Sequence, residues 1–131
     1  MRAVTPVPVE PENCLPMPDL KNAVTIMFAS ETVTALPYYF SYPDRLHCVN
    51  VQIVAVLTCN SRAHYNGEIL PGMYCAAAAG KDACSGDSGG PTTYHSEVVG
   101  VTSWGYTCGS PLYPGVYSDV GFFRDWIDSQ M

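Results

Sequence analysis

The sequence predicts an all-β protein, a small antiparallel barrel or sandwich that ends in one short helix. Of its 131 residues 47% are hydrophobic and only 14% are charged, so the chain can bury one core. Glycine and proline contribute 11 residues each and separate short segments of β-branched and aromatic residues, as turns separate strands. We therefore expect one domain of short strands rather than a helical bundle.

The first part of the chain predicts a connector. Residues 4–19 are rich in proline and acidic residues and lack hydrophobic periodicity, which is typical of an extended segment. We assign residues 1–21 to this connector and residues 22–131 to the β domain.

Strands are predicted where β-branched residues alternate with others. Residues 23–28 form the first segment, and residues 46–57 contain the alternating run Val-Asn-Val-Gln-Ile-Val-Ala-Val. Further short strands are expected at residues 69–77, 91–94, 97–104 and 115–120.

The last segment has a helical pattern instead. Phe122, Phe123, Trp126 and Ile127 recur at helical spacing, with charged residues between them. We expect a short amphipathic helix at the C-terminus.

The charge of the chain excludes some partners. The net charge is −6 and the six basic residues are scattered, so there is no basic patch for nucleic acid or an anionic membrane. No apolar stretch approaches the roughly 20 residues that span a bilayer, and the proline-rich start resembles no export signal.

The six cysteines indicate disulfides. They include no C-x-x-C pair and are accompanied by only three histidines, so a zinc site is not indicated. Disulfides imply an oxidising compartment, and from the sequence alone many pairings stay open.

The strongest chemical signal lies around Ser88. Glycines flank this serine in Gly86-Asp87-Ser88-Gly89-Gly90, and glycine permits tight backbone geometry that a side chain would forbid. Such a turn can aim two N–H groups at one point, which is what the oxyanion of a tetrahedral intermediate requires.

The wider context resembles a known family. The run from Lys81 to Pro91, KDACSGDSGGP, resembles the nucleophile motif of chymotrypsin/trypsin-like serine proteases, and the resemblance continues through Ser103-Trp104-Gly105 and Pro114-Gly115-Val116-Tyr117. It implies the second, C-terminal barrel of that two-barrel fold, with a short C-terminal helix. The first barrel is expected to be missing, because the motifs that hold the family's catalytic histidine and aspartate have no match in the sequence.

The resemblance implies roles for individual residues. Ser88 matches the nucleophile, and the N–H groups of Gly86 and Ser88 match the oxyanion hole. Asp82 matches the acid at the floor of the specificity pocket, and Gly105 and Gly115 match the glycines that leave its walls open. The implied preference is cleavage after arginine or lysine. The alternative for Asp82 is a solvated carboxylate in a turn.

Other positions carry over in the same way. Ser103 and Trp104, with Gly105, match the strand that binds the substrate backbone, although Trp104 could instead be a core aromatic. Asp87 matches the structural aspartate that pairs with the new α-amino group after zymogen cleavage. We expect it to lack that partner here, since the chain has no cleaved Ile-Val-Gly-Gly start.

The resemblance also implies the disulfides. Cys84 would bond to Cys108 and Cys59 to Cys75. Cys48 and Cys14 match positions whose partners lie outside this barrel, so both are expected to be unpaired or externally bonded.

The general base that a serine nucleophile needs has no match. The family's Ala-Ala-His-Cys motif and its orienting aspartate are absent from the sequence. His47 precedes a cysteine but follows Arg45-Leu46, while His64 and His95 lie in predicted loops, where an ordinary surface histidine is the simpler interpretation.

Two functions follow as hypotheses. The first is the C-terminal half of a secreted, trypsin-like endopeptidase that is inactive alone and requires an N-terminal barrel in cis or in trans, with Cys14 and Cys48 as possible links. The second is a non-catalytic binding or regulatory module that uses the Asp82 pocket. Neither requires a cofactor or a metal.

Overall fold

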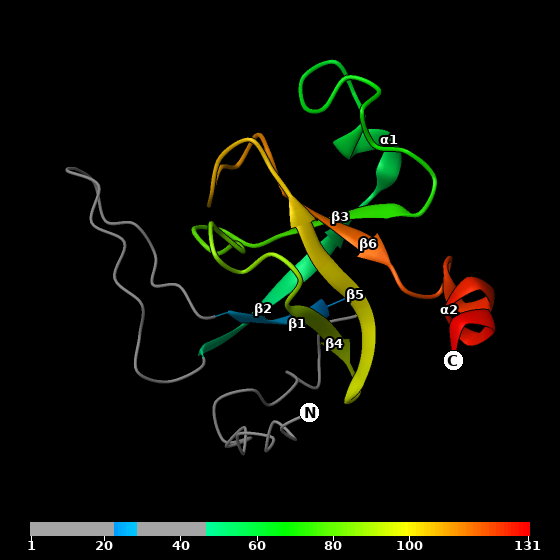
Figure 1. Ribbon diagram of the computed structural model, residues 1–131. Helices are drawn as coiled ribbons and strands as arrows, with labels where there is room; N and C mark the ends of the chain where they lie inside the picture. The colour runs from blue at the N-terminus through cyan, green and yellow to red at the C-terminus, as the bar shows by residue number, and fades with distance from the viewer. Residues whose placement is uncertain (1–22, 29–46) are drawn as a thin grey trace.

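The described strands form a closed antiparallel barrel. The computed structural model describes residues 23–28 and 47–131, and in this part of the chain the strand order is β1-β2-β3-β6-β5-β4, with β1 and β4 closing the barrel (Figure 1). The strands are β1 (Ala23–Phe28), β2 (His47–Val54), β3 (Met73–Ala77), β4 (Pro91–Tyr94), β5 (Glu97–Trp104) and β6 (Gly115–Asp119). The predicted antiparallel barrel is confirmed, and the alternative of a sandwich is wrong. The connector 1–21 lies outside the described residues.

Most strand boundaries agree with the sequence pattern, and two differ. The strand predicted to reach residue 57 ends at Val54, because the carbonyl of Ala55 accepts hydrogen bonds from the N–H groups of Thr58 and Cys59. These bonds begin the short helix α1 (Val56–Cys59). The strand predicted from residue 69 begins only at Met73, so the apolar residues ahead of it belong to a loop.

The barrel has one hydrophobic cluster inside and another outside. Neighbouring residues on a strand point to opposite faces, and on β3 and β6 both faces are covered. Ala76 and Tyr117 pack with Val51 in the inner cluster. Cys75 and Val116 pack in the outer cluster with Cys59 of α1 and with Tyr65 and Ile69 of the loop between α1 and β3.

A glycine makes room for an aromatic stack in the inner cluster. The rings of Tyr74 and Tyr117 are stacked with centroids 5.4 Å apart. A Cβ on Gly100 of β5 would lie 2.1 Å from the Tyr74 hydroxyl oxygen, so only glycine fits opposite this tyrosine.

Two disulfides fasten the loops to the barrel. Cys59 bonds to Cys75 and Cys84 bonds to Cys108, as the resemblance implies. Cys48 is disulfide-bonded, so of the two alternatives for this residue the unpaired one is excluded. Cys14 lies outside the described residues.

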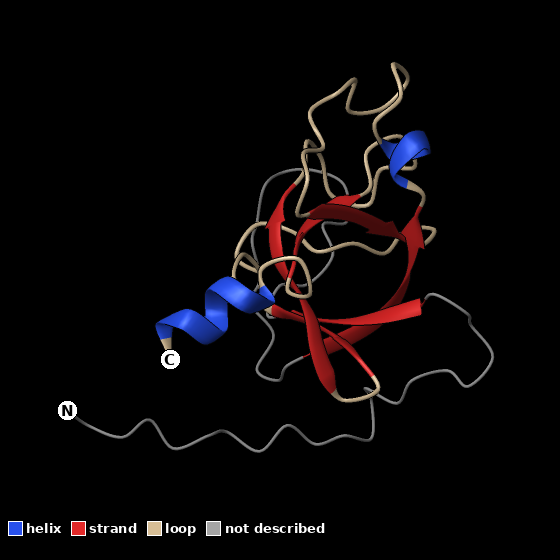
Figure 2. Cartoon of the chain, turned by 90° about the vertical axis from the view of Figure 1, so that its right-hand side faces the viewer, coloured by secondary structure: helices blue, strands red, loops and turns tan. Residues whose placement is uncertain are grey.

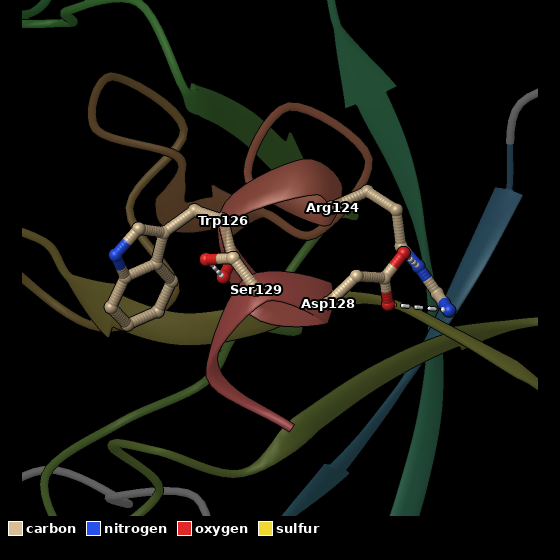
Figure 3. Close-up of polar contacts among 4 residues, drawn as sticks. All are labelled: Arg124, Trp126, Asp128 and Ser129. Atoms are coloured by element: carbon tan, nitrogen blue, oxygen red, sulfur yellow. Dashed lines mark hydrogen bonds and ion pairs between the residues drawn. The ribbon is translucent and has the colours of Figure 1, made fainter.

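The C-terminal helix α2 (Arg124–Gln130) projects from the barrel (Figure 2). The predicted helix is present, but none of its residues is buried. Figure 3 shows the indole of Trp126 on the opposite side of the helix from an ion pair between Arg124 and Asp128, whose nearest N and O atoms are 2.9 Å apart. The Ser129 hydroxyl donates to the Trp126 carbonyl. Trp126 is 64% exposed, so the apolar side of the helix faces solvent.

None of the helices in the described part of the chain has the length and apolar character needed to cross a bilayer.

Candidate active site

The loop between β3 and β4 holds Ser88 at the mouth of a cavity. Gly86 and Gly89 have φ values of 102° and 84°. Residues with a side chain rarely adopt such values, so the backbone conformation at these two positions requires glycine. The N–H of Gly89 donates to the Thr102 carbonyl and the N–H of Thr102 donates to the Gly90 carbonyl, both at 2.9 Å. These bonds fix the loop to β5, while Ser88 itself stays exposed.

Asp87 holds the Ser88 loop together through hydrogen bonds. Its side chain is buried, with 4% of its surface exposed, and its Oδ2 accepts a 2.7 Å hydrogen bond from the Cys84 N–H. The Asp87 N–H donates in turn to the Cys84 carbonyl, and the Gly90 N–H to the Asp87 carbonyl. The resulting turn carries Ser88, the residue after Asp87, which lines the cavity.

Two N–H groups of this turn remain available as donors. Within residues 47–131, neither the Gly86 N–H nor the Ser88 N–H has a hydrogen-bond acceptor. An unoccupied pair of backbone donors beside a serine is the arrangement that an oxyanion needs. The same part of the chain supplies no hydrogen-bond partner to the Ser88 hydroxyl.

Asp82 lies on the wall of the same cavity, which has a volume of about 220 Å³. The cavity is lined by residues 82–85, Ser88, residues 102–108 and residues 115–117. Asp82 is 9% exposed, and its Oδ2 accepts a 3.0 Å hydrogen bond from the Gly109 N–H. Its Oδ1 is buried and has no hydrogen-bond partner among the described residues. The carboxylate is therefore not the solvated turn residue of the alternative interpretation.

Burial sets the ionisation of Asp82. Desolvation raises the pKa of Asp82 from 3.8 to about 6, against the opposing effect of hydrogen bonds from Gly109 and Ala83, and the nearby charge of Asp87 adds to the increase. At neutral pH most of the Asp82 carboxyl groups are ionised, and the described residues offer hydrogen bonds to only one of the two oxygens. A cation entering the cavity would supply the missing partner.

The two glycines of the cavity wall differ in what they allow. A Cβ on Gly115 would lie 2.5 Å from Asp82 Oδ1 and 2.8 Å from the Tyr117 hydroxyl oxygen. A Cβ on Gly105 would meet the Tyr65 hydroxyl oxygen at 3.6 Å, an ordinary contact. Gly115 is thus a steric requirement for the Asp82 position, and Gly105 is not.

The end of β5 passes beside the cavity. Pairing with β4 stops at Val101, and a register shift between Thr102 and Trp104 leaves Ser103 bulged in the pairing with β6. Ser103, Trp104 and Gly105 all line the cavity. A bulge at the end of a ladder releases main-chain groups from pairing.

Aromatic rings that the sequence analysis missed form one side of the site. Tyr65 is fully buried, donates a 2.6 Å hydrogen bond to the Pro114 carbonyl, and has its ring centroid 4.9 Å from Trp104 and 5.1 Å from Tyr106. Trp104 is therefore both a packing residue and a lining residue. The high number of tyrosines, 9 in the chain, could have indicated an aromatic cluster. The sequence could not show which of them meet, because Tyr65 and Tyr106 lie in loops that are distant in the sequence.

The histidines lie in separate places. His47 begins β2, His64 lies in the loop before β3 against the Leu112 carbonyl, and His95 is in the β4–β5 turn. The described residues contain no hydrogen bond from any of them to Ser88 and no cluster of side chains that could hold a metal ion.

Comparison with known proteins finds a matching family model and similar proteins. The family model described as Trypsin matches residues 12–127. The chain is 53% identical to Trypsin alpha of Drosophila erecta over 90 residues, 68% of this chain and 35% of that protein. It is 45% identical to Trypsin-3 of Salmo salar over 93 residues, 70% of this chain and 38% of that protein.

A solved structure is also similar. Neuropsin, a serine protease expressed in the limbic system of mouse brain, matches with a TM-score of 0.74 and 38% identity, over 95% of this chain and 54% of that chain. The chain thus spans only about a third of the length of the two trypsins and about half of neuropsin.

Proposed function

Because this chain belongs to the trypsin family of serine proteases, we propose that it is the C-terminal half of a serine endopeptidase that cleaves after arginine or lysine. In this proposal residues 1–21 connect the missing N-terminal barrel to the barrel of residues 22–131. The observation that carries the proposal is the buried, half-unpaired Asp82 carboxylate in the cavity at whose mouth Ser88 lies.

Ser88 would be the nucleophile. Its Oγ would attack the scissile carbonyl carbon, the hydroxyl proton would pass to a general base, and the carbonyl oxygen would become an oxyanion. The N–H groups of Gly86 and Ser88, which have no acceptor within residues 47–131, would be the donors for that oxyanion. The buried Asp87 would hold the turn that positions them.

Substrate selection would rest on Asp82. A guanidinium or ammonium group can complete the hydrogen bonding of Asp82 Oδ1 and also compensate its charge, whereas a neutral donor can do only the first. Gly115 keeps the approach to this carboxylate free. The released main chain at Ser103–Gly105 would bind the substrate backbone as an added strand.

The general base would come from a second structural unit. No described histidine is bonded to Ser88, so we expect the chain alone to be inactive and to require an N-terminal barrel in cis or in trans. Exposed apolar side chains on α1, the following loop and α2, including Leu57 at 90% exposure, Leu70 and Trp126, support a covered surface in the complete protein. The disulfides support a secreted protein.

The test is to express the full reading frame that contains this chain and measure hydrolysis of peptide amides. Arginyl and lysyl amides should be cleaved and a norleucyl amide should not, and Ser88→Ala should abolish the reaction. The chain of 131 residues by itself should bind benzamidine but should not hydrolyse the arginyl or lysyl amides. Efficient cleavage of the norleucyl amide would reject the assignment of Asp82.

A second candidate is a non-catalytic module that binds basic side chains in the Asp82 pocket. The lack of a described base at Ser88 favours it. It predicts that the full reading frame also binds benzamidine without hydrolysing arginyl amides, and that Ser88→Ala changes nothing.

A further inference from the structure

The loop between α1 and β3 contains an exposed turn formed by Asn66 and Gly67. Both residues have positive φ values, 46° for Asn66 and 93° for Gly67, in the left-handed region that asparagine and glycine adopt more readily than other residues. A Cβ added at Gly67 would meet no atom within 4 Å. The glycine side of this turn is therefore open to solvent.

An asparagine followed by glycine is chemically labile, because no side chain shields the glycine nitrogen. The backbone nitrogen of the glycine loses its proton and attacks Cγ of the asparagine. A bond from this nitrogen to Cγ forms, the bond from Cγ to Nδ2 breaks, and the amide leaves as ammonia with the proton. Water then opens the resulting succinimide at either ring carbonyl, which gives aspartate or isoaspartate. Water is the only co-reactant.

The described asparagines differ in how their side chains are held. Asn60 is fixed at both ends of its amide, because its Nδ2 donates to the Ile69 carbonyl and its Oδ1 accepts from the Ile69 N–H, both at 2.9 Å. Asn50 lies within β2 and precedes a valine. Within residues 47–131 the Asn66 side-chain amide makes no hydrogen bond. Of the three, only Asn66 combines an exposed, unbonded amide with a following glycine.

One hydrogen bond restrains the nitrogen that would react. The Gly67 N–H donates to the Asn60 carbonyl at 3.1 Å. While this bond is intact the nitrogen is held with its proton, so the turn must open before the nitrogen can attack. The two bonds between the Asn60 side chain and Ile69, here called the Asn60 clamp, hold the same turn closed.

We propose that Asn66 is a site of spontaneous deamidation and that the Asn60 clamp sets its rate. The isoaspartate product lengthens the main chain by one carbon between Tyr65 and Gly67. Tyr65 is the buried residue whose hydroxyl donates to the Pro114 carbonyl and whose ring packs against Trp104. The modification would therefore loosen the aromatic side of the cavity without any change at Ser88 or Asp82.

The experiment incubates the full chain at pH 8 and follows each asparagine by peptide mapping with mass spectrometry, with isoaspartyl methyltransferase labelling to identify isoaspartate. Asn66 should convert and Asn60 should not. The rate should rise with pH, because the attacking nitrogen must lose its proton. Asn60→Ala removes the clamp and should accelerate conversion at Asn66 roughly 5- to 10-fold, the effect of losing one or two hydrogen bonds. A free peptide of residues 61–70 should convert faster still.

A milder variant guards against a failure to fold, which circular dichroism detects. Asn60→Asp keeps the acceptor for the Ile69 N–H and should convert at a rate between those of the wild type and Asn60→Ala. The isoaspartate form should also unfold at lower urea than Asn66→Asp, which adds the charge without the extra carbon.

Two results would overturn the proposal. If Asn66 stays intact in the folded chain while the free peptide converts, Asn66 is not a deamidation site. If the wild type and both Asn60 variants convert at the rate of the free peptide, the clamp does not control the reaction.

Discussion

The Cβ that Gly115 lacks would lie 2.5 Å from Oδ1 of Asp82. Gly115→Ala should therefore displace the carboxylate or fill the space above it, and benzamidine affinity should fall by at least about tenfold, equivalent to ~1.4 kcal/mol. Gly105→Ala is the matched control, since its Cβ has an ordinary 3.6 Å contact and should cost less. Titration calorimetry measures both, with circular dichroism to check that each variant folds. Equal losses would show that the two glycines act alike.

Binding of a cation should depend on pH through Asp82. Because burial raises the pKa of Asp82 to about 6, the carboxylate gains a proton as the pH falls through that value. Benzamidine stays cationic across this range, so its affinity should be constant above about pH 7 and roughly tenfold weaker at pH 5. An affinity that is unchanged between pH 8 and pH 5 would contradict the assignment.

The ionised form of Asp82 favours binding of a cation but lowers the stability of the folded chain. The pKa of Asp82 is higher in the folded chain than its ordinary 3.8, so the folded state binds the proton more tightly and the contribution of Asp82 to stability declines as the pH rises through about 6. Asp82→Asn should raise the free energy of unfolding at pH 8, on the order of 1–3 kcal/mol, and by little at pH 3.5. Urea unfolding at both pH values measures this. A variant less stable than wild type at pH 8 would refute the prediction.

The two disulfides should have separable effects. Cys84–Cys108 connects the Ser88 loop to the segment that follows Tyr106, so replacing both residues by alanine should abolish benzamidine binding. Cys59–Cys75 lies in the outer hydrophobic cluster, and the same replacement there should cost about 2–5 kcal/mol of stability. Binding at low temperature should persist in the second variant, and its loss there would mean that the two bonds are not independent.

The β4–β5 turn should be a site for stabilisation. His95 and Ser96 have φ values of 47° and 66°, and a two-residue hairpin turn with positive φ at both positions favours Asn-Gly. Replacing the pair by Asn-Gly should raise the unfolding free energy by about 1 kcal/mol. Ser96→Gly alone should supply part of this gain. No gain in urea unfolding would indicate that the contact between the Tyr94 and His95 rings compensates for the backbone strain.

The local sequence pattern was sufficient to predict strands whose limits are set by neighbouring residues. The ranges of β1, β4 and β5 followed from alternation and turn residues, whereas the two disulfides were implied only by the family resemblance. The early end of β2 did not, because the run Val54-Ala55-Val56 alternates like a strand, whereas hydrogen bonds to the Ala55 carbonyl turn the chain.

The site could be predicted from the sequence only in part, because only some of its residues are close together in the chain. Ser88 and Asp82 lie within one short motif, so the sequence could indicate that they act together. The contact of Tyr106 with Glu68 joins the loop before β6 to the loop before β3, and these two strands pair with each other although they are distant in the sequence. No local pattern carries that information. Whether Cys48 is bonded was likewise left open by the sequence, since disulfide partners are set by tertiary structure.

The positions of the 2 tryptophans give the chain an optical property. Trp104 lines the cavity, and Trp126 lies on α2 with its indole in solvent. In Trp126→Phe the emission would come from Trp104 alone, so that the intensity and wavelength of fluorescence become a direct readout of cavity occupancy. Trp126 does not line the cavity, so its replacement removes the background emission without changing the cavity. The remaining tryptophan, Trp104, then reports binding in the cavity.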